Sequence, residues 1–357
     1  MKPTNLSTHT QALCNNHVIE ADTCVREAMK KLNMLSGKSM TLFVKDSCDK
    51  IIGSVTDGDI RRALIAGKEL ADPVAEVMNR DFLYATLADS DMAVKLNEGR
   101  KKHIELMPVL HQGRLVEFID LNITKAQLPL EAVLMAGGRG ERLRPLTDTI
   151  PKPLLEVDGK PIIDYNIEEL EACGIKKIHV TVNYLAHMIE NHFDLRQGIA
   201  DVKCVREPRH LGTFGSLALI KGISSDNIIV MNSDLLSSID FEGMFAHHLH
   251  SKSDFTIAAV PYSVSVPFAI MRTHRSRVTS LEEKPTYNYF ANGGVYIMKT
   301  ELIGRIPLGE YLDAPDFIMA LIKDNFNVSA FHIDGSWIDI GSPDDYRLAK
   351  DLMARRR

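Results

Sequence analysis

The sequence lacks the features that mark several large classes of protein. Its 357 residues contain no apolar run near the roughly 18 residues of a membrane-spanning helix, and residues 1–16 lack the apolar core of a signal peptide. The five cysteines form no C-x-x-C pair, which argues against a zinc or redox site. The net charge is only −5, which excludes a broad nucleic-acid surface. We therefore expect a cytoplasmic protein with reduced thiols and no membrane or nucleic-acid partner.

What remains is an ordinary globular composition. Apolar residues make up 45% of the chain and charged residues 25%, so a disordered or fibrous chain is excluded. The length predicts about two domains. The hydrophobic pattern changes near residue 127, which predicts domains at residues 1–126 and 127–357.

The first domain contains a faint internal repeat. In residues 17–66 and again in residues 80–125, a short strand and a helix lead to two strands around a turn. Two similar α+β units in tandem are therefore predicted ahead of the second domain.

A segment of the first repeat, GSVTDGDIRRAL at residues 53–64, resembles the nucleotide-facing segment of the cystathionine-β-synthase (CBS) domain family. The resemblance implies a tandem CBS module that holds a regulatory nucleotide through the residues Thr56, Asp57 and Asp59. In the second repeat Glu117 stands where the first has Gly53, so at most one nucleotide site is expected. The alternative is that the pair of repeats only mediates assembly.

The second domain alternates apolar strands with helical stretches. A helix is expected at residues 162–174, with Gly174 as a favourable end. Strands are expected at residues 131–136, 176–183, 227–233 and 254–261. This alternation predicts an α/β fold with a mainly parallel sheet covered by helices on both faces.

The strongest chemical signal is the segment MAGGRGERLRPLT at residues 135–147, directly after the first of these strands. Its glycines permit a tight loop whose backbone N–H groups approach phosphates, and its arginines add positive charge. It is not a Walker loop, because no G-K-S/T sequence follows.

This loop and the segments that follow it resemble the sugar-1-phosphate nucleotidyltransferase family, over about residues 131–350. The matching segments are PKPLLEVDGKPII (151–163), REPRHLGTFGSL (206–217), VMNSD (230–234), LEEKP (281–285), NGGVYIM (292–298) and WIDIGSPDDY (337–346). The resemblance implies a Rossmann-like, GT-A-like mixed sheet. It also implies transfer of a nucleoside monophosphate from a nucleoside triphosphate to a sugar 1-phosphate, with release of pyrophosphate.

Both substrates of such a reaction are anions, so catalysis is expected to consist mainly of positioning and charge neutralisation. By the resemblance, the catalytic cations are Arg142, Lys152 and Lys284, and the ligands of Mg²⁺ are Asp234 and Asp339. Two carboxylates with phosphate oxygens suit Mg²⁺. The nearby histidines are expected on a solvated helix face: His247, His248 and His250.

Glu207 is the most informative residue for the choice of base. A carboxylate only accepts hydrogen bonds, which suits the adjacent N1–H and amino donors of guanine, so GTP is favoured. Further nucleotide contacts are expected from Leu134, Ala136, Gly137, Gly138, Arg139, Gly140 and Gly212. Sugar-phosphate contacts are expected from Asn183, Glu283, Asn292 and Gly293.

Two other functions stay open at this point. One is a CTP-dependent cytidylyltransferase that acts on a phosphocholine-like phosphate, and nucleotide preference separates it from the first. The other is a non-catalytic nucleotide sensor. Paired CBS domains expose apolar helices that commonly pack on a second pair, so a homodimer or homotetramer is expected.

Overall fold

The computed structural model describes residues 16–35, 39–86, 92–196 and 198–354. The chain divides into two compact units, Met1–Gln127 and Leu128–Arg357, referred to as unit 1 and unit 2. Among the helices that the structure describes, none combines the length and apolarity needed to traverse a bilayer.

Unit 1 consists of two halves with the strand–helix–strand–strand order that the sequence predicts. The first half contains β1 (Val18–Glu20), α2 (Val25–Met34), β2 (Thr41–Lys45), β3 (Ile51–Thr56), α3 (Asp57–Ile65) and the 3-10 helix η1 (Val74–Glu76). The second contains β4 (Ala85–Thr86), α4 (Met92–Lys101), β5 (Leu106–His111) and β6 (Arg114–Asp120). In each half the first strand pairs parallel to the second, and the second pairs antiparallel to the third.

An apolar cluster joins the two halves of unit 1. It contains Phe43 and Ile51 from the first half with Leu106, Leu110 and Phe118 from the second. Full burial of a side chain of this size contributes about 1.5–3 kcal/mol. The repeated pattern therefore folds as one body with a shared core.

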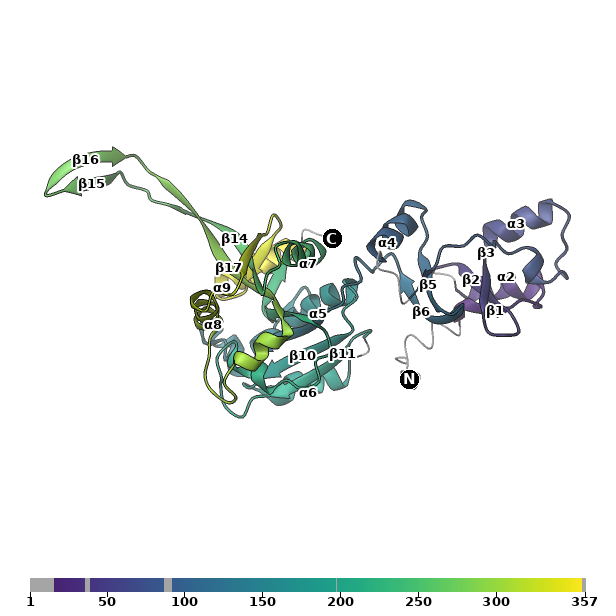
Figure 1. Cartoon of the computed structure of the whole chain (residues 1–357), viewed down its shortest axis with the longest axis horizontal. Helices are drawn as coiled ribbons and strands as arrows, with labels where there is room; N and C mark the ends of the chain where they lie inside the picture. The colour runs from purple at the N-terminus through teal and green to yellow at the C-terminus, as the bar shows by residue number, and fades with distance from the viewer. Residues whose placement is uncertain (1–15, 36–38, 87–91, 197, 355–357) are drawn as a thin grey trace. The chain divides into compact units, whose positions relative to one another are not determined.

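Unit 2 is built on a seven-stranded mixed sheet (Figure 1). Its spatial order is β11 (Asp201–Arg206), β10 (Lys177–Val182), β7 (Glu131–Ala136), β12 (Asn227–Asn232), β17 (Thr286–Lys299), β14 (Phe255–Ser265) and β18 (Val328–His332). In this sheet only β17 is antiparallel to its neighbours, and the other pairs of adjacent strands are parallel. The parallel strands are the short apolar runs of the sequence, as expected for strands buried on both faces.

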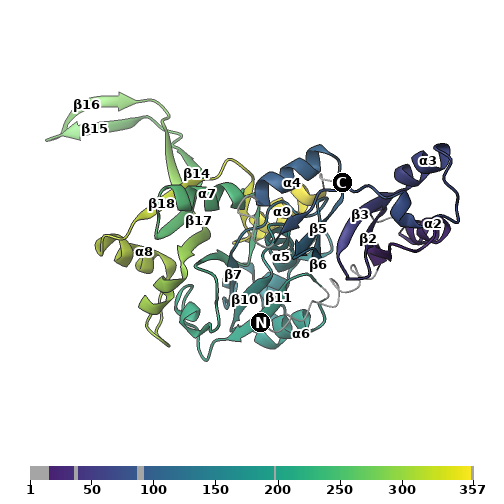
Figure 2. The ribbon, with the colours of Figure 1, turned by 45° about the vertical axis from the view of Figure 1, so that its right-hand side comes forward.

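Helices cover the sheet of unit 2 (Figure 2). They are α5 (Ile162–Ala172), α6 (Ala186–Asp194), α7 (Phe241–His250), α8 (Ala314–Lys323) and α9 (Pro343–Ala354). Phe214, Phe255 and Phe317 pack together in the main core, on the side of α8. Truncating a buried Phe of this kind to Ala costs about 3–5 kcal/mol.

Helix α7 corrects one expectation from the sequence. His248 is only 1% exposed, and its ring nitrogens hydrogen-bond Thr256 (2.7 Å) and Asn227 (3.1 Å). Burial lowers the pKa of His248 to about 4. The prediction of a solvated face is therefore wrong for this histidine, because it satisfies buried polar groups of the neighbouring strands.

A long two-stranded ribbon leaves the sheet of unit 2. Strands β14 and β17 stay paired as far as Ser265 and Thr286, and a hairpin of β15 (Ile270–His274) and β16 (Arg277–Glu282) follows. In both views the hairpin stands apart from the helices and the sheet (Figures 1 and 2). Residues 260–291 are named the arm below.

Candidate active site

A cavity of about 400 Å³ opens at the carboxyl ends of β7 and β12, the edge where open α/β sheets bind ligands. Ser233 and Asp234 extend β12 into it, and Gly137 and Gly138 extend β7. The structure places nine of the predicted site residues on its wall: Ala136, Gly137, Gly138, Gly140, Arg142, Lys152, Glu207, Gly212 and Asp234.

The glycine-rich loop is held by contacts that its own motif supplies. Leu143, at the end of the 3-10 helix η2 (Glu141–Leu143), is 1% exposed and anchors the loop in an apolar cluster. The hydroxyl of Thr147 donates to the carbonyl of Gly140 (2.9 Å), and that of Tyr184 donates to the carbonyl of Thr147 (3.0 Å). The RPLT continuation therefore fixes the loop at the mouth of the cavity.

Lys152 lies at the start of the 3-10 helix η4 (Lys152–Leu154) and is only 9% exposed. Its ammonium group pairs with the carboxylate of Asp234 and lies 3.7 Å from Oδ1 of Asp339. Arg142 adds a second positive charge on the same side, since its guanidinium lies against Gly341, two residues after Asp339. Burying a cation such as that of Lys152 is costly unless opposite charge lies close by, and the two aspartates provide that charge.

The two aspartates are brought together by a small ribbon. β13 (Leu235–Ser237) follows Asp234 directly and pairs antiparallel with β19 (Trp337–Asp339), with Leu235 opposite Asp339. Burial and the nearby charge of Asp234 raise the pKa of Asp339. This is the behaviour of two carboxylates that share one site.

Oxygens of both aspartates fit a divalent metal. In the described part of the chain, Oδ1 of Asp234 and Oδ1 of Asp339 are buried without a hydrogen-bond partner. Buried polar atoms almost always have a partner, so these oxygens point to a ligand. No group of three or more His, Cys, Asp or Glu side chains within the described residues is arranged to hold a metal. Water and phosphate oxygens would complete the shell, as Mg²⁺ favours.

Glu207 also lines the cavity and is 4% exposed. Its Oε2 accepts from the amide of Leu211 (3.1 Å), and its Oε1 lies against Gly137, where any Cβ would stand 2.3 Å from it. Burial raises the pKa of Glu207, and the hydrogen bond from Leu211 opposes that rise. Gly137 is therefore required for the close approach of this carboxyl group to the loop.

The other residues predicted to bind the nucleotide or the sugar near this wall are Asn183, Leu134, Arg139 and Gly212. The side chain of Asn183 donates to the carbonyl of Glu207 (3.3 Å) and lies beside Gly137. Leu134 is fully buried inside β7, and Arg139 is exposed on the loop. Gly212 has a φ of +76°, and a Cβ there would stand 2.6 Å from the carbonyl oxygen of Leu312.

The predicted sugar-phosphate residues are divided between two places. Asn292 and Gly293 lie on β17, next to the cavity strand β12: the amide of Gly294 donates to Oδ1 of Asn292 (3.0 Å), and the indole of Trp337 donates to the carbonyl of Gly293 (2.9 Å). Glu283 and Lys284 lie exposed on the arm, and the structure does not bring them to the cavity.

Sequence reasoning missed several residues of the cavity wall. They are Met135, Glu141, Pro153, Thr181, His210, Thr213, Asn232, Ser233 and Gly341. Most lie inside the segments that resemble the nucleotidyltransferase family, so those segments were the signal that could have identified them. Asp313 could not be found that way, although it holds the loop of Thr213 by accepting from its amide (3.0 Å) and hydroxyl (3.2 Å).

In unit 1, the residues predicted for a regulatory nucleotide form the start of α3. Oδ2 of Asp59 accepts from the amide (2.9 Å) and the hydroxyl (2.7 Å) of Thr56, and the amide of Asp59 donates back to that hydroxyl (3.3 Å). Asp59 also pairs with Arg62, and Asp57 pairs with Arg61. This is a capping box, which satisfies the first turn of the helix without a ligand.

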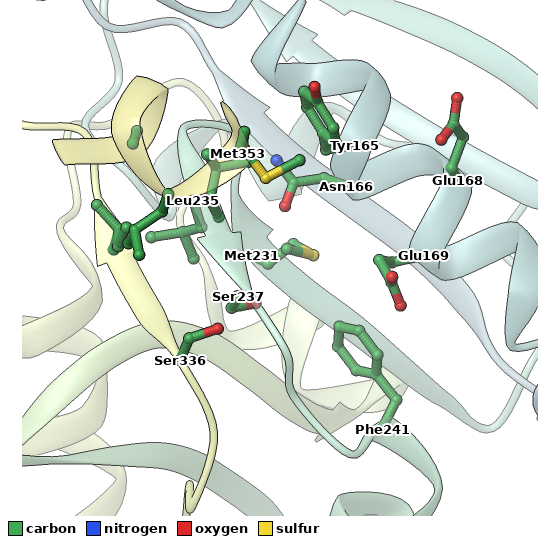
Figure 3. A pocket seen from close by; sticks show the side chains of 14 residues that line it. Tyr165, Asn166, Glu168, Glu169, Met231, Leu235, Ser237, Phe241, Ser336 and Met353 are labelled. Atoms are coloured by element: carbon green, nitrogen blue, oxygen red, sulfur yellow. The ribbon is translucent and has the colours of Figure 1, made fainter. Parts of the chain in front are cut away.

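A second cavity in unit 2, of about 100 Å³, has a different lining (Figure 3). Tyr165, Asn166, Glu168 and Glu169 of α5 face Met353 of α9 and residues of β13 and β19. Its lining contains acidic and apolar side chains but no Lys or Arg. A site for anionic substrates requires cations, so the larger cavity is the candidate active site.

Comparison with known proteins agrees with this geometry. The profile of the family described as "Nucleotidyl transferase" matches residues 131–356, leaving residues 1–130 uncovered. The chain is 31% identical over 226 residues to D-glycero-alpha-D-manno-heptose 1-phosphate guanylyltransferase of Aneurinibacillus thermoaerophilus, covering 62% of this chain and 97% of that relative. It is 31% identical over 228 residues to mannose-1-phosphate guanyltransferase of Gibberella zeae, covering 61% of this chain and spanning 62% of the length of that relative.

A solved structure shows the same fold. The crystal structure of HddC from Yersinia pseudotuberculosis, complexed with GMP-PN, superposes with a TM-score of 0.50 at 27% identity, covering 63% of this chain and 99% of that chain. A second crystal structure of HddC from the same organism gives a TM-score of 0.51 at 28% identity.

Proposed function

Because the chain belongs to the nucleotidyl transferase family, we propose that it transfers a nucleoside monophosphate, from GTP in preference to other triphosphates, to a sugar 1-phosphate. The observation that carries this proposal is the placement of Lys152 between Asp234 and Asp339 beside a glycine-rich loop. Cations and a metal-binding pair in one cavity suit a reaction between two phosphate anions.

The proposed reaction is an in-line displacement. A phosphate oxygen of the sugar 1-phosphate attacks the α-phosphorus of the triphosphate, the bond from the α-phosphorus to its bridging oxygen breaks, and pyrophosphate leaves. Lys152 and Arg142 neutralise the negative charge that the two substrates bring together. Asp234 and Asp339 would hold Mg²⁺, which neutralises phosphate charge when bound.

Glu207 supports the preference for guanine. Its Oε2 holds the loop through Leu211, while its Oε1 lies at the cavity wall beside Gly137. An ionised carboxylate accepts from the N1–H and amino groups of guanine. Such bonds stabilise the charged form, so binding of GTP should lower the raised pKa of Glu207. The relatives described above are named guanylyltransferases, which supports the same base.

The test is a pyrophosphate-release assay with Mg²⁺, four nucleoside triphosphates and a panel of mannose, heptose and glucosamine 1-phosphates. GTP should give the highest kcat/KM with one of these sugars. Preference for CTP with phosphocholine would identify a cytidylyltransferase instead. Binding of a nucleotide without turnover for any pair would identify a nucleotide sensor.

Glu207→Gln sharpens the test of base choice. Gln keeps an oxygen for the amide of Leu211 but replaces a charged acceptor, so kcat/KM with GTP should fall at least about tenfold. Glu168→Gln is the matched control, because Glu168 is exposed and pairs only with Lys160 among the ion pairs of the described chain. An unchanged ranking of the four triphosphates in Glu207→Gln would remove Glu207 from base selection.

For unit 1 we propose a tandem CBS module with a regulatory or assembly role. The two similar halves and their shared core support this proposal. Calorimetry of the full chain with adenine and guanine nucleotides, in Asp234→Asn to weaken binding at the active site, separates the two roles. Heat from a second class of sites supports regulation, and silence supports assembly.

A further inference from the structure

The carboxyl group of Glu207 is oriented by the backbone a few residues after it. The hydrogen bond that the described chain shows for this group comes from the amide of Leu211 (3.1 Å). Residues 206–215, which contain both, are named the base loop below. Glu207 is 4% exposed, so little solvent is at hand to replace a lost partner. The direction of its Oε1 therefore depends on where the base loop holds Leu211.

The base loop is attached to residues 311–313, which precede α8. The amide of Leu312 donates to the carbonyl of Leu211 (2.9 Å), and the amide of Phe214 donates to the carbonyl of Leu312 (2.9 Å). Gly212 permits this close approach, since any Cβ there would stand 2.6 Å from the carbonyl oxygen of Leu312. These contacts fix the position of Leu211 relative to the start of α8.

Asp313 is the side chain that fastens this attachment. Its Oδ1 accepts from the amide (3.0 Å) and the hydroxyl (3.2 Å) of Thr213, and its Oδ2 accepts from the hydroxyl of Tyr311 (2.7 Å). An aspartate at the N-cap of a helix ordinarily bonds amides of the first turn. Within the described chain the side chain of Asp313, the N-cap of α8, makes no such bond, and the hydroxyl of Thr213 accepts from the amide of Ala314 instead (2.8 Å). The base loop therefore caps the helix, and the N-cap carboxylate holds the base loop.

The charge of Asp313 strengthens this hold. Burial alone would raise the pKa of Asp313, but hydrogen bonds from Tyr311 and Thr213 outweigh it and lower this pKa. Hydrogen bonds to an ionised acceptor are stronger than those to a neutral one. Among the described residues, Gly212 and Thr213 line the cavity and Asp313 does not. Asp313 therefore stabilises the wall of the cavity from behind.

We propose that Asp313 is a positioning residue for base selection, which acts through Thr213 and Leu211 to keep Glu207 in the orientation that receives guanine. The inference rests on the proposed function, because that function assigns the recognition of guanine to Glu207. A binding side chain selects its ligand well only when its own position is fixed by the residues packed behind it. Selectivity among nucleotides then depends on a residue outside the lining of the cavity.

Steady-state kinetics with GTP and with the next best triphosphate test this role. Asp313→Ala should lower kcat/KM with GTP about tenfold, and the ratio of the two kcat/KM values should fall with it. The loss should come from a higher KM with kcat nearly unchanged, because contacts to the base are equal in the ground state and the transition state. Asp313→Asn keeps an oxygen for Thr213 and should retain most of the ratio. If Asp313→Ala lowers both activities alike, the role of Asp313 is structural and the inference is wrong.

A double-mutant cycle with Glu207→Gln shows whether Asp313 acts through Glu207. Adding Asp313→Ala to Glu207→Gln should leave the ratio nearly unchanged, because the carboxylate that Asp313 positions is already absent. Additive losses would show another route and overturn the inference. Asp316→Ala is the matched control, since Asp316 is an exposed aspartate in the first turn of the same helix. It should keep the ratio of the wild type.

A smaller change covers the case in which Asp313→Ala does not fold, which circular dichroism would show. Tyr311→Phe removes only the hydroxyl that donates to Asp313, and Tyr311 is 58% exposed, so folding should be preserved. This variant should lower the ratio about twofold, because one of the bonds that fix the carboxylate is lost. An unchanged ratio in Tyr311→Phe would then count against the inference.

Calorimetric titration of the full chain with each triphosphate separates this inference from the proposed function. If the wild type turns over no substrate pair, the proposed function fails. A preference for GTP in binding that Asp313→Ala removes and Asp316→Ala keeps would still support the positioning role. If the wild type binds all four triphosphates equally, or if Asp313→Ala keeps the preference of the wild type, the inference is wrong.

Discussion

Asp59 in unit 1 and Asp339 in unit 2 both lie in segments whose sequence predicts a ligand, yet their surroundings differ. Asp59 accepts two hydrogen bonds from Thr56 and pairs with Arg62. Asp339 shares its site with Asp234, and within the described residues its buried Oδ1 has no hydrogen-bond partner. A motif identifies candidate residues, but the contacts of each carboxylate decide whether a ligand is needed to complete it.

The largest effect is expected at Asp339, whose buried Oδ1 has no hydrogen-bond partner among the described residues. Asp339→Asn should lower kcat/KM at least about 100-fold, because it removes the charge of one of the two proposed metal ligands. Mn²⁺ titration followed by electron paramagnetic resonance should show weaker binding as well. Asp344→Asn is the control, since Asp344 is 84% exposed at the start of α9. Equal metal affinity in Asp339→Asn and the wild type would contradict the assignment.

The pH dependence of the same site has a defined sign. Burial and Asp234 raise the pKa of Asp339 above its usual value of 3.8. Without metal, the folded state therefore holds the proton more tightly than the unfolded state, and this contribution to stability is lost as pH rises through the raised pKa. Metal affinity should increase over the same range, because the metal displaces that proton. Mn²⁺ affinity that stays constant from pH 4 to pH 7 would contradict this.

A buried carboxylate with many partners should behave in the opposite way. Burial alone would raise the pKa of Glu131, but hydrogen bonds from Ser224, Lys177 and His179 outweigh it and lower this pKa to about 2. The resulting stability is present above the unfolded pKa and is lost as pH falls toward about 2. Glu131→Gln should lower the free energy of unfolding at pH 7 by up to about 3 kcal/mol.

Urea denaturation followed by Trp337 fluorescence measures this effect in unit 2. The difference between Glu131→Gln and the wild type should shrink below pH 4.5. The exposed Glu168→Gln serves again as the control and should change stability by less than about 0.5 kcal/mol. A difference that does not depend on pH would show that the lost packing, and not the charge, is responsible.

Local features of the sequence predicted much of the fold. The expected strand at residues 131–136 is β7, and the expected helix at 162–174 is α5, which ends at Ala172. Apolar runs and a helix-ending glycine are local signals, so they identify elements without knowledge of their neighbours.

The site was predictable where its residues follow a strand end, as Gly137 and Asp234 do. The partnership of Asp234 with Asp339 depends on the pairing of β13 with β19, which no periodicity reveals. The position of Lys284 depends on how far β14 and β17 remain paired beyond the sheet. Contacts between distant segments are set by packing. Motifs therefore identify candidate residues, but they do not show which of these residues lie together in the folded chain.

The smallest effect is expected at the satisfied carboxylate of unit 1. Asp59→Ala removes half of the capping box and should lower local stability by about 1 kcal/mol. Hydrogen exchange of the α3 amides should then be about five times faster than in the wild type. Asp57→Ala removes only an exposed ion pair with Arg61, so α3 should exchange nearly as before. Equal exchange rates in Asp59→Ala and Asp57→Ala would mean that the cap contributes little, and Asp59 would then be left available for a ligand, as Asp339 is.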